Sequence, residues 1–258
     1  MSVKVITYDE FANKRYTPHK DLFFAATNSL VEIAAAELSK AICSLPVGFI
    51  KQEDQFVLVA LMGIEQNKNL FVGKDGSWLA GYLPALLRAS PFTLASVNTG
   101  EKVLCVDDTV QMSIGNDGRP FFLEDKKPDE SLIKAMEFLQ AFDANRVVTL
   151  KAVNALNDAG LIKPWDITIK LTNGPTRLEG LFGVSEAELN KVDKDTLIKL
   201  RDAGALVLAY CQMISTQHLE FLARLADAQS KKSQLDLSGF GKDQLDFSFL
   251  NNLPKGEN

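Results

Sequence analysis

The chain has 258 residues, of which 46% are hydrophobic and 24% are charged, and its formal net charge is −5. These values are typical of a globular protein with a large buried core. The acidic balance excludes a strongly basic protein that binds mainly nucleic acid, and it disfavours an anionic membrane surface as partner. The longest apolar run, 203–214, contains Gly204 and Gln212. It is shorter than the roughly 20 apolar residues of a membrane span, so we expect no span.

The cysteines and the first residues indicate a compartment. Cys43, Cys105 and Cys211 form no CxxC pair, and each has apolar neighbours. Such a set predicts buried free thiols in a reducing environment. The opening MSVKVITYDEF lacks a basic stretch followed by an apolar one, so no secretory signal is predicted. We therefore expect a cytoplasmic protein.

The first half of the chain is predicted to combine one helix with a series of strands. A short alternating strand covers 3–6. Ser29 and Glu32 have the spacing of a capping box, which predicts a helix from 29 to about 43. Short β-rich runs broken by turn residues, between 47 and 106, predict a β meander in an antiparallel sheet or small barrel.

The second half is predicted to be mainly helical. Apolar residues at helical spacing predict one long helix from 129 to 159, with Asp129 as its N-cap. The pair Asn173-Gly174 predicts the turn of a hairpin over 166–183. Further helices follow, and the last helical region is predicted to run from 205 to about 228.

These elements predict an α+β fold, with an antiparallel sheet or small barrel, one long central helix and a C-terminal helical part. We expect one domain over 1–228, with a candidate sub-boundary near 107–128. Residues 229–258 are polar and contain a near-repeat, Leu-Asp-Leu-Ser at 235–238 and Leu-Asp-Phe-Ser at 245–248. This segment is either a flexible tail or an extended segment that docks on a sheet edge or a partner.

The most distinctive stretch of the sequence runs from 70 to 92. It places Trp78, Tyr82, Arg88 and Phe92 close together in an apolar context. In one interpretation the aromatic side chains fill the core, while Arg88 covers their edge and pairs with an acid. In the other, they line a groove for a peptide or partner protein, and Arg88 anchors a carboxylate.

Residues for acid–base or nucleophilic catalysis are scarce. The chain has only two histidines, His19 and His218. A histidine-based metal site or a Ser-His-Asp triad is therefore disfavoured. The sequence contains no Walker loop, no dinucleotide-binding GxGxxG and no GxSxG elbow. We expect no cofactor.

An acidic metal site is the alternative. Asp107 and Asp108 close a predicted strand, and Glu124 and Asp125 follow a polar loop. If the sheet brings these acids together, their oxygens could bind Mg²⁺ or Ca²⁺. Otherwise they are solvated turn residues.

Several segments, in this order, resemble the bacterial SapC-like family. They are HKDLFF (19–24), PVGFIKQEDQFVLVALMGI (46–64), NLFVGKDGSWLAGYLPALLRASPF (69–92), LCVDD (104–108), RPFFLEDKKPDESLIKAMEFL (119–139) and GLFGVSEAELNKVDKDTLIKLRDAGALVLAY (180–210). The similarity covers about 3–226 and leaves out the tail.

The resemblance implies a role beside other proteins. The family is named after a surface-layer-associated protein, which implies a function with surface-layer protein or its secretion. Relatives lie in gene neighbourhoods with TonB-dependent receptors, halogenase-like flavoproteins and cupin-like oxygenases, which implies an accessory role in nutrient uptake or peptide modification. The family offers no catalytic residues to carry over. An unrelated peptide-transporter permease has the same name but needs membrane spans, which this chain lacks.

The sequence thus predicts a cytoplasmic, non-enzymatic binding or accessory protein with a peptide or protein partner. Its predicted site consists of Trp78, Tyr82, Arg88 and Phe92. The alternatives are an enzyme or enzyme subunit with the acidic metal site, and a structural subunit of a larger assembly. The oligomeric state is not predicted.

Overall fold

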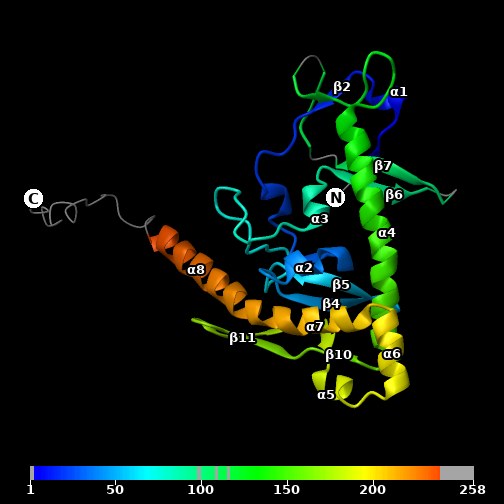
Figure 1. Ribbon diagram of the computed structural model, residues 1–258. Coiled ribbons are helices and arrows are strands. Elements are labelled where there is room, and N and C mark those ends of the chain that lie inside the picture. The colour runs from blue at the N-terminus through cyan, green and yellow to red at the C-terminus, as the bar shows by residue number, and fades with distance from the viewer. Residues whose placement is uncertain (1–2, 98–99, 108–109, 115–116, 239–258) are drawn as a thin grey trace, which may run out of the picture.

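A computed structural model describes residues 3–97, 100–107, 110–114 and 117–238. Figure 1 shows two groups of strands, one above the other, beside a single long helix, α4 (Glu130–Asp158), that runs along both. Helix α8 (Leu219–Ser238) leaves the lower group toward the C-terminus. The predicted α+β class, with antiparallel strands, a long central helix and C-terminal helices, is confirmed.

The lower group is built on a five-stranded antiparallel sheet in the order β10-β13-β4-β5-β3. Its strands are β3 (Leu30–Glu32), β4 (Val47–Gln52), β5 (Gln55–Leu61), β10 (Ile162–Pro164) and β13 (Leu181–Val184). A separate hairpin joins β11 (Ile167–Leu171) and β12 (Gly174–Leu178). The hairpin lies within the predicted range 166–183, but it ends at Leu178, and the following residues from Leu181 belong to β13 of the five-stranded sheet. Leu171 pairs with Gly174, so the turn residues are Thr172 and Asn173.

Helices cover the lower sheet and complete its core. They are α2 (Leu38–Ala41), α5 (Glu186–Leu189), α6 (Lys194–Asp202) and α7 (Ala205–Ser215), with 3-10 turns at Ala35–Glu37 and Thr216–His218. Fully buried side chains such as Phe49, Leu58 and Leu156 come from β4, β5 and the lower half of α4. Each such side chain contributes about 1.5–3 kcal/mol when it leaves water.

The upper group contains two three-stranded antiparallel sheets, β1-β7-β6 and β8-β2-β9. The strands are β1 (Val3–Val5), β2 (Lys14–Tyr16), β6 (Phe92–Ser96), β7 (Lys102–Asp107), β8 (Met112–Ile114) and β9 (Arg119–Pro120). Helix α1 (Tyr8–Phe11) and the upper half of α4 close this second hydrophobic cluster. A 3-10 turn at Phe23–Ala25 and helix α3 (Ala85–Arg88) lie in the segments that lead from one group to the other.

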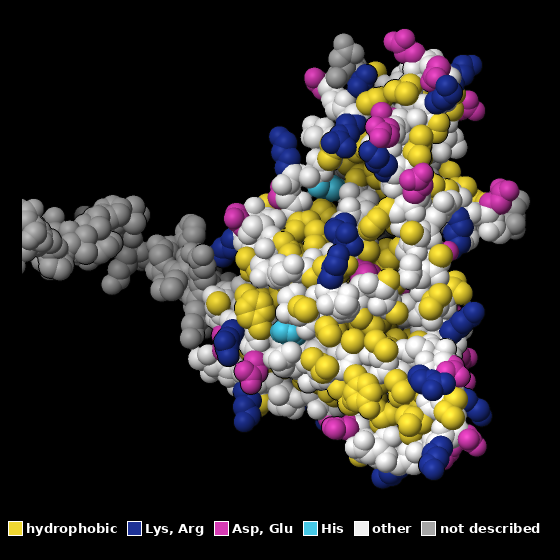
Figure 2. Space-filling view, viewed as in Figure 1, with side chains coloured by type: hydrophobic (Ala, Val, Ile, Leu, Met, Phe, Trp, Pro, Cys, Tyr) yellow, Lys and Arg dark blue, Asp and Glu magenta, His cyan; other side chains and the backbone are white. Residues whose placement is uncertain are grey.

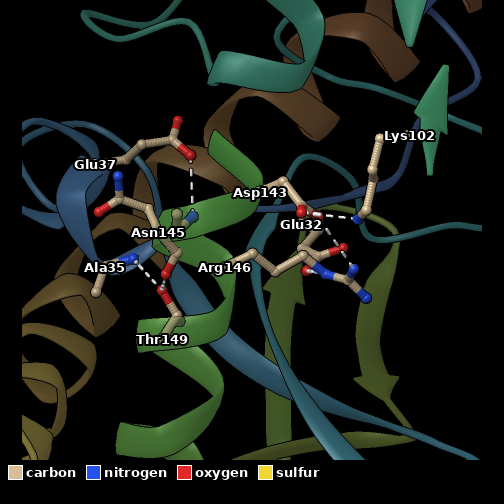
Figure 3. Close-up of polar contacts among 9 residues, drawn as sticks. Glu32, Ala35, Glu37, Lys102, Asp143, Asn145, Arg146 and Thr149 are labelled. Carbon is tan, nitrogen blue, oxygen red and sulfur yellow. Dashed lines mark hydrogen bonds and ion pairs between the residues drawn. The ribbon is translucent and has the colours of Figure 1, made fainter. Parts of the chain in front are cut away.

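Polar contacts from α4 bind it to strands of both groups. In Figure 3, Lys102 of β7 and Glu32 of β3 lie near neighbouring residues of the helix. Lys102 Nζ is 2.7 Å from Asp143 Oδ2, and Arg146 Nε is 2.7 Å from Glu32 Oε1. The predicted N-cap is confirmed, since the Asp129 side chain accepts a hydrogen bond from Ser131 N at the start of α4. The helix is thus fixed at its start and in its middle.

The predicted helix from 29 to about 43 is wrong. Residues 30–32 form β3, which pairs antiparallel with β5, and only Leu38–Ala41 is α-helical. Val31 and Ile33 are both buried at alternate positions, so pairing with a distant strand outweighs the local cap signal. Glu32, expected in the capping box, forms the ion pair with Arg146 instead.

Two further expectations change. The β meander over 47–106 is divided, because β4 and β5 belong to the lower sheet and β6 and β7 to the upper one.

All three cysteines are free, as expected, and Cys105 is buried, but Cys43 is exposed after the short helix α2. Helix α8 crosses the predicted start of the tail at residue 229, and residues 239–258, with the second copy of the near-repeat, lie outside the described residues.

Candidate binding site

The segment from 70 to 92 leads from β5 in the lower group to β6 in the upper group. Trp78 forms an isolated antiparallel bridge with Val72, and its ring is tilted against Phe71 at 5.6 Å between centroids. The Trp78 Nε1–H donates to the Tyr82 carbonyl oxygen at 2.9 Å. This half-buried indole therefore packs on the lower core and fixes the backbone just before α3.

Glu37 is a buried carboxylate that organises the start of α3. It is only 7% exposed, and its Oε1 accepts from Tyr82 Oη at 2.8 Å and from Ala85 N at 2.7 Å. Its Oε2 accepts from Ala34 N at 3.0 Å. A buried charge is tolerated where several donors satisfy it, and three donors do so here. No local pattern in the sequence indicates this role, because two of the three donors, Tyr82 and Ala85, come from one distant segment.

Thr149 of α4 fixes the backbone beside this carboxylate. Its Oγ1 accepts from Ala35 N at 2.7 Å and donates to the Asn145 carbonyl oxygen at 2.8 Å. Figure 3 shows the contact between Thr149 of α4 and Ala35, which belongs to the same 3-10 turn as Glu37. The turn that carries Glu37 is therefore attached directly to the central helix.

The Tyr82 hydroxyl lies between Glu37 and Arg88. Burial, together with the Glu37 carboxylate, raises the pKa of Tyr82 to about 12. The hydroxyl consequently stays protonated near neutral pH, donates to Glu37 and accepts from Arg88 Nη2 at 3.1 Å. The chain Glu37–Tyr82–Arg88 thus runs from the lower core to the protein surface.

Arg88 ends this hydrogen-bond chain at the surface. Its guanidinium carbon is 5.5 Å from the centroid of the Tyr82 ring and 5.2 Å from that of Phe138 on α4. Stacking on two rings restricts the side chain and leaves its outer N–H groups available. Within the described residues no carboxylate forms an ion pair with Arg88, so the acid partner of the core interpretation is not found there.

A pocket of about 390 Å³ opens beside Arg88, and we call it the Arg88 pocket. It is lined by Tyr16, Pro18, Arg88, Ala89, Ser90, Pro91, Phe92, Arg119, Ser131, Lys134, Ala135 and Phe138. The lining combines three cationic side chains with three aromatic ones. Figure 2 shows Lys and Arg side chains over the upper end of α4, with Asp and Glu side chains among them and exposed hydrophobic surface beside them.

Aromatic packing builds the apolar side of the Arg88 pocket. The Phe92 ring meets Tyr16 edge to face at 5.1 Å between centroids, and Tyr16 is also 5.0 Å from Phe121. The Tyr16 hydroxyl is held by Ser131 Oγ at 2.9 Å. Because Phe92 and Tyr16 are almost fully buried, this wall is part of the upper core and is rigid.

Two of the three cationic side chains, Lys134 and Arg119, have acidic neighbours outside the pocket lining. Lys134 forms an exposed pair with Glu130 at 2.7 Å, one helical turn away, and such pairs are weak. Burial acts to raise the pKa of Asp129, but hydrogen bonds from Ser131 and the Arg119 charge hold it below its usual value. The lining itself therefore combines three cationic side chains with an apolar wall, and the acidic neighbours lie outside it.

The structure places the four sequence-predicted residues in two roles. Arg88 and Phe92 both line the Arg88 pocket, whereas Trp78 and Tyr82 lie behind it and hold Arg88 in place. The sequence did not indicate Arg119, Lys134 or the other lining residues. Arg119 and Lys134 lie within one of the segments that carry the family resemblance, 119–139, but nothing local connects these two residues to Arg88.

The acidic alternative has no cluster in the described ranges. No three His, Cys, Asp or Glu side chains there lie close enough together to hold a metal ion. Asp125 pairs with Lys127 at 2.8 Å, Asp107 ends β7, and Asp108 lies outside the described residues. A metal site at Asp107, Asp108, Glu124 and Asp125 stays a prediction.

The two histidines have separate surroundings. His19 stacks on Phe24 at 4.5 Å between ring centroids, in the N-terminal part of the chain. His218 Nε2 is 2.8 Å from the Ile42 carbonyl oxygen, in the lower group. The first contact is a ring stack and the second is a hydrogen bond to the backbone, and neither histidine lines the Arg88 pocket.

Fold and site together define an α+β protein with a cationic, aromatic pocket built on its upper hydrophobic cluster. The SapC family model matches residues 6–222, so the chain belongs to the SapC family. The match includes every residue of the Arg88 pocket. No curated protein and no solved structure matches the chain significantly. Within the described part of the chain, none of the helices has the length and apolar character that a membrane crossing requires.

Proposed function

We propose that this SapC-family chain is a non-enzymatic binding protein, and that the Arg88 pocket holds a segment of a peptide or protein partner. One observation carries the proposal. Arg88 is positioned by Tyr82 and by two aromatic rings, and no described carboxylate pairs with it. A cation that is held in place but has no acid partner is suited to bind an anionic group from another molecule.

The chemistry of the lining favours binding over catalysis. The Arg88 pocket contains no His, Cys, Asp or Glu side chain. Of its two serines, Ser131 donates its hydroxyl hydrogen to the Asp129 carboxylate, which serves as the N-cap of α4 and has a pKa held below its usual value, so it is a weak base. Ser131 Oγ is already engaged by Asp129 and by the Tyr16 hydroxyl.

The size of the pocket supports a short segment as ligand. About 390 Å³ is near the small end of the roughly 300–1,000 Å³ that ligand pockets occupy. One or two side chains fill such a volume, while a folded partner would contact the surrounding surface. The hydrophobic surface next to the pocket offers such an area.

The accessory role and the cytoplasmic location are parts of the same proposal. Free Cys43, Cys105 and Cys211 are typical of a reducing compartment. The family name supports a role with surface-layer, receptor-linked uptake or peptide-modification systems. The partner is then a protein of one of these systems.

The test compares proteins captured from the native cell by the tagged full chain and by two variants. Arg88→Ala removes the positioned cation, and Trp78→Phe removes the bond to the Tyr82 carbonyl oxygen. Arg201→Ala is the matched control, because Arg201 is an exposed arginine on α6 of the lower group. We expect partners to be lost with Arg88→Ala, reduced with Trp78→Phe and kept with Arg201→Ala. Folded Arg88 and Trp78 variants that capture the same partners as the parent chain would refute the proposal.

A further inference from the structure

We infer that the Arg88 pocket recognises the C-terminal residue of a partner peptide, with the free carboxylate at Arg88 and an aromatic or large apolar side chain against Phe92. This inference rests on the proposed function and names the ligand of the same site. It follows from the charges around the pocket, from the small size of the pocket, and from the direction of side chains in an extended peptide.

The charges around the pocket are opposite to those of the whole chain. The protein has a formal net charge of −5, yet Arg88, Arg119 and Lys134 all line this one pocket. Neither arginine forms an ion pair with a described acid, and Lys134 can exchange its exposed partner Glu130 for a ligand. A ligand that enters here must be anionic to gain from these charges.

The guanidinium group of Arg88 is suited to a carboxylate. An arginine has five N–H donors, and Tyr82 Oη accepts one from Nη2 at 3.1 Å. The remaining donors can form the two parallel hydrogen bonds that a carboxylate accepts from arginine. The Tyr82 phenol is neutral, so it positions Arg88 without neutralising its charge.

A phosphate group fits this site less well. Anions with two charges are commonly bound by free backbone N–H groups at the start of a helix. At the start of α4 the Asp129 carboxylate already accepts from Ser131 N at 2.9 Å. Its negative charge lies beside the pocket lining and repels a dianion more strongly than a monoanion.

The small size of the pocket favours one ligand residue that carries both a charge and a large apolar side chain. Arg88 and Phe92 line the same pocket, which has a volume of about 390 Å³. In an extended peptide, consecutive side chains point to opposite faces, so an internal acid and the aromatic residue next to it cannot both enter one pocket. A C-terminal residue has its carboxylate and its side chain on the same Cα and therefore meets both requirements.

The experiment titrates the full-length protein with four defined probes and follows binding by NMR. The main probe is the peptide acetyl-Gly-Ser-Gly-Phe with a free C-terminus. The others are the same peptide as its C-terminal amide, acetyl-Gly-Glu-Phe-Gly-amide, which has an internal acid, and phenyl phosphate. We expect the free-acid peptide to bind at least tenfold more tightly than each of the others and to shift the signals of Ala89 and Ser131.

Variants assign the binding to the pocket. Arg119 is exposed at the rim of the pocket, and Arg119→Gln is expected to weaken binding of the free-acid peptide at least threefold. Arg88→Gln is expected to abolish binding of this peptide. Arg201→Gln is the matched control and should bind like the parent chain. Because the Arg119 side chain is exposed and forms no ion pair within the described residues, this variant keeps the test valid even if Arg88→Gln does not fold.

Each result has a defined meaning. Equal binding of the free-acid peptide and its amide would refute recognition of a carboxylate. Equal or tighter binding of the internal-acid peptide would refute the claim that the carboxylate is the C-terminus of the partner. Tighter binding of phenyl phosphate would overturn the ligand class. If no probe binds but capture of native partners still depends on Arg88, this inference fails and the proposed function stands. If capture is also independent of Arg88, both fail.

Discussion

Tyr82 Oη donates a hydrogen bond of 2.8 Å to Glu37 Oε1, although the two residues are 45 positions apart in the sequence. Glu37 belongs to a turn attached to α4, and Tyr82 belongs to the connection that leads into α3. The same carboxylate oxygen accepts from Ala85 N, the first residue of α3. The position of the Arg88 pocket therefore depends on one buried acid in the lower group.

Glu37→Ala is expected to lower the free energy of unfolding by roughly 2–4 kcal/mol, because buried donors left without an acceptor cost about 1–3 kcal/mol each. Urea denaturation followed by circular dichroism measures this change. Glu179→Ala removes an exposed glutamate and serves as the control, with an expected change within about 0.5 kcal/mol. Equal stability of the two variants would show that the hydrogen bonds of Glu37 contribute nothing.

Tyr82→Phe is expected to cost about 1 kcal/mol near pH 8, since it removes the bonds to Glu37 and Arg88. Burial and Glu37 raise the pKa of Tyr82 to about 12, above the value of about 10 of an unfolded chain. The stabilisation from this shift is complete below pH 10 and is lost as the pH rises from about 10 to about 12.

The difference in stability between the parent chain and Tyr82→Phe should therefore shrink over this pH range. Urea denaturation of both proteins at pH 8, 10 and 11 tests the point. Tyr210→Phe removes a phenol from an exposed position on α7 and controls for the general effect of alkaline pH. A difference that stays constant or grows from pH 8 to pH 11 would contradict the prediction.

The contact between Glu32 and Arg146 should be measurable as a coupling energy. The two side chains are partly exposed, at 26% and 43%, so we expect a coupling of about 0.5–1 kcal/mol in a double-mutant cycle with alanine. The exposed pair Arg224–Glu220, at 3.5 Å, offers a control cycle with a coupling near zero. Equal coupling in the two cycles would mean that the Arg146 pair does not help hold α4 on β3.

Gly63→Ala should disrupt the chain just after β5. A Cβ atom at this position would lie 1.8 Å from the Lys68 carbonyl oxygen, so the backbone must move. We expect a loss of more than about 3 kcal/mol in unfolding free energy, or an insoluble product. Gly81→Ala is the control, because its Cβ would have no neighbour closer than 3.6 Å. A Gly63 variant as stable as the Gly81 variant would refute the expected clash.

Local signals in the sequence predicted the elements that form from neighbouring residues. The cap at Asp129, the helix that follows it and the antiparallel strands β4 and β5 within the predicted β-rich region all appear where expected. Their determinants lie within a few residues of each other, so periodicity and turn chemistry suffice. The strand at 30–32 was missed because its partner, β5, is about thirty residues away.

The site was only half predictable for the same reason. Arg88 and Phe92 are four residues apart in the sequence, so they could be recognised together. Arg119 and Lys134 reach the pocket from another sheet and from α4. Glu37 appeared to be an ordinary helix residue until its donors were known. Long-range pairing of this kind leaves no trace in composition or spacing.

Helix α4 has 29 residues, and at about 1.5 Å of rise per residue it is a rod of about 43 Å. Leu132 and Leu139 lie in one hydrophobic cluster, and Val153 and Leu156 lie in the other. Because both halves belong to one straight helix, neither half can tilt in its own cluster without moving the other half in the second cluster. A ligand bound in the Arg88 pocket, at the Lys134 end of α4, should therefore slow hydrogen exchange of backbone amides near Leu156. Exchange in the lower group would then report on binding in the upper group.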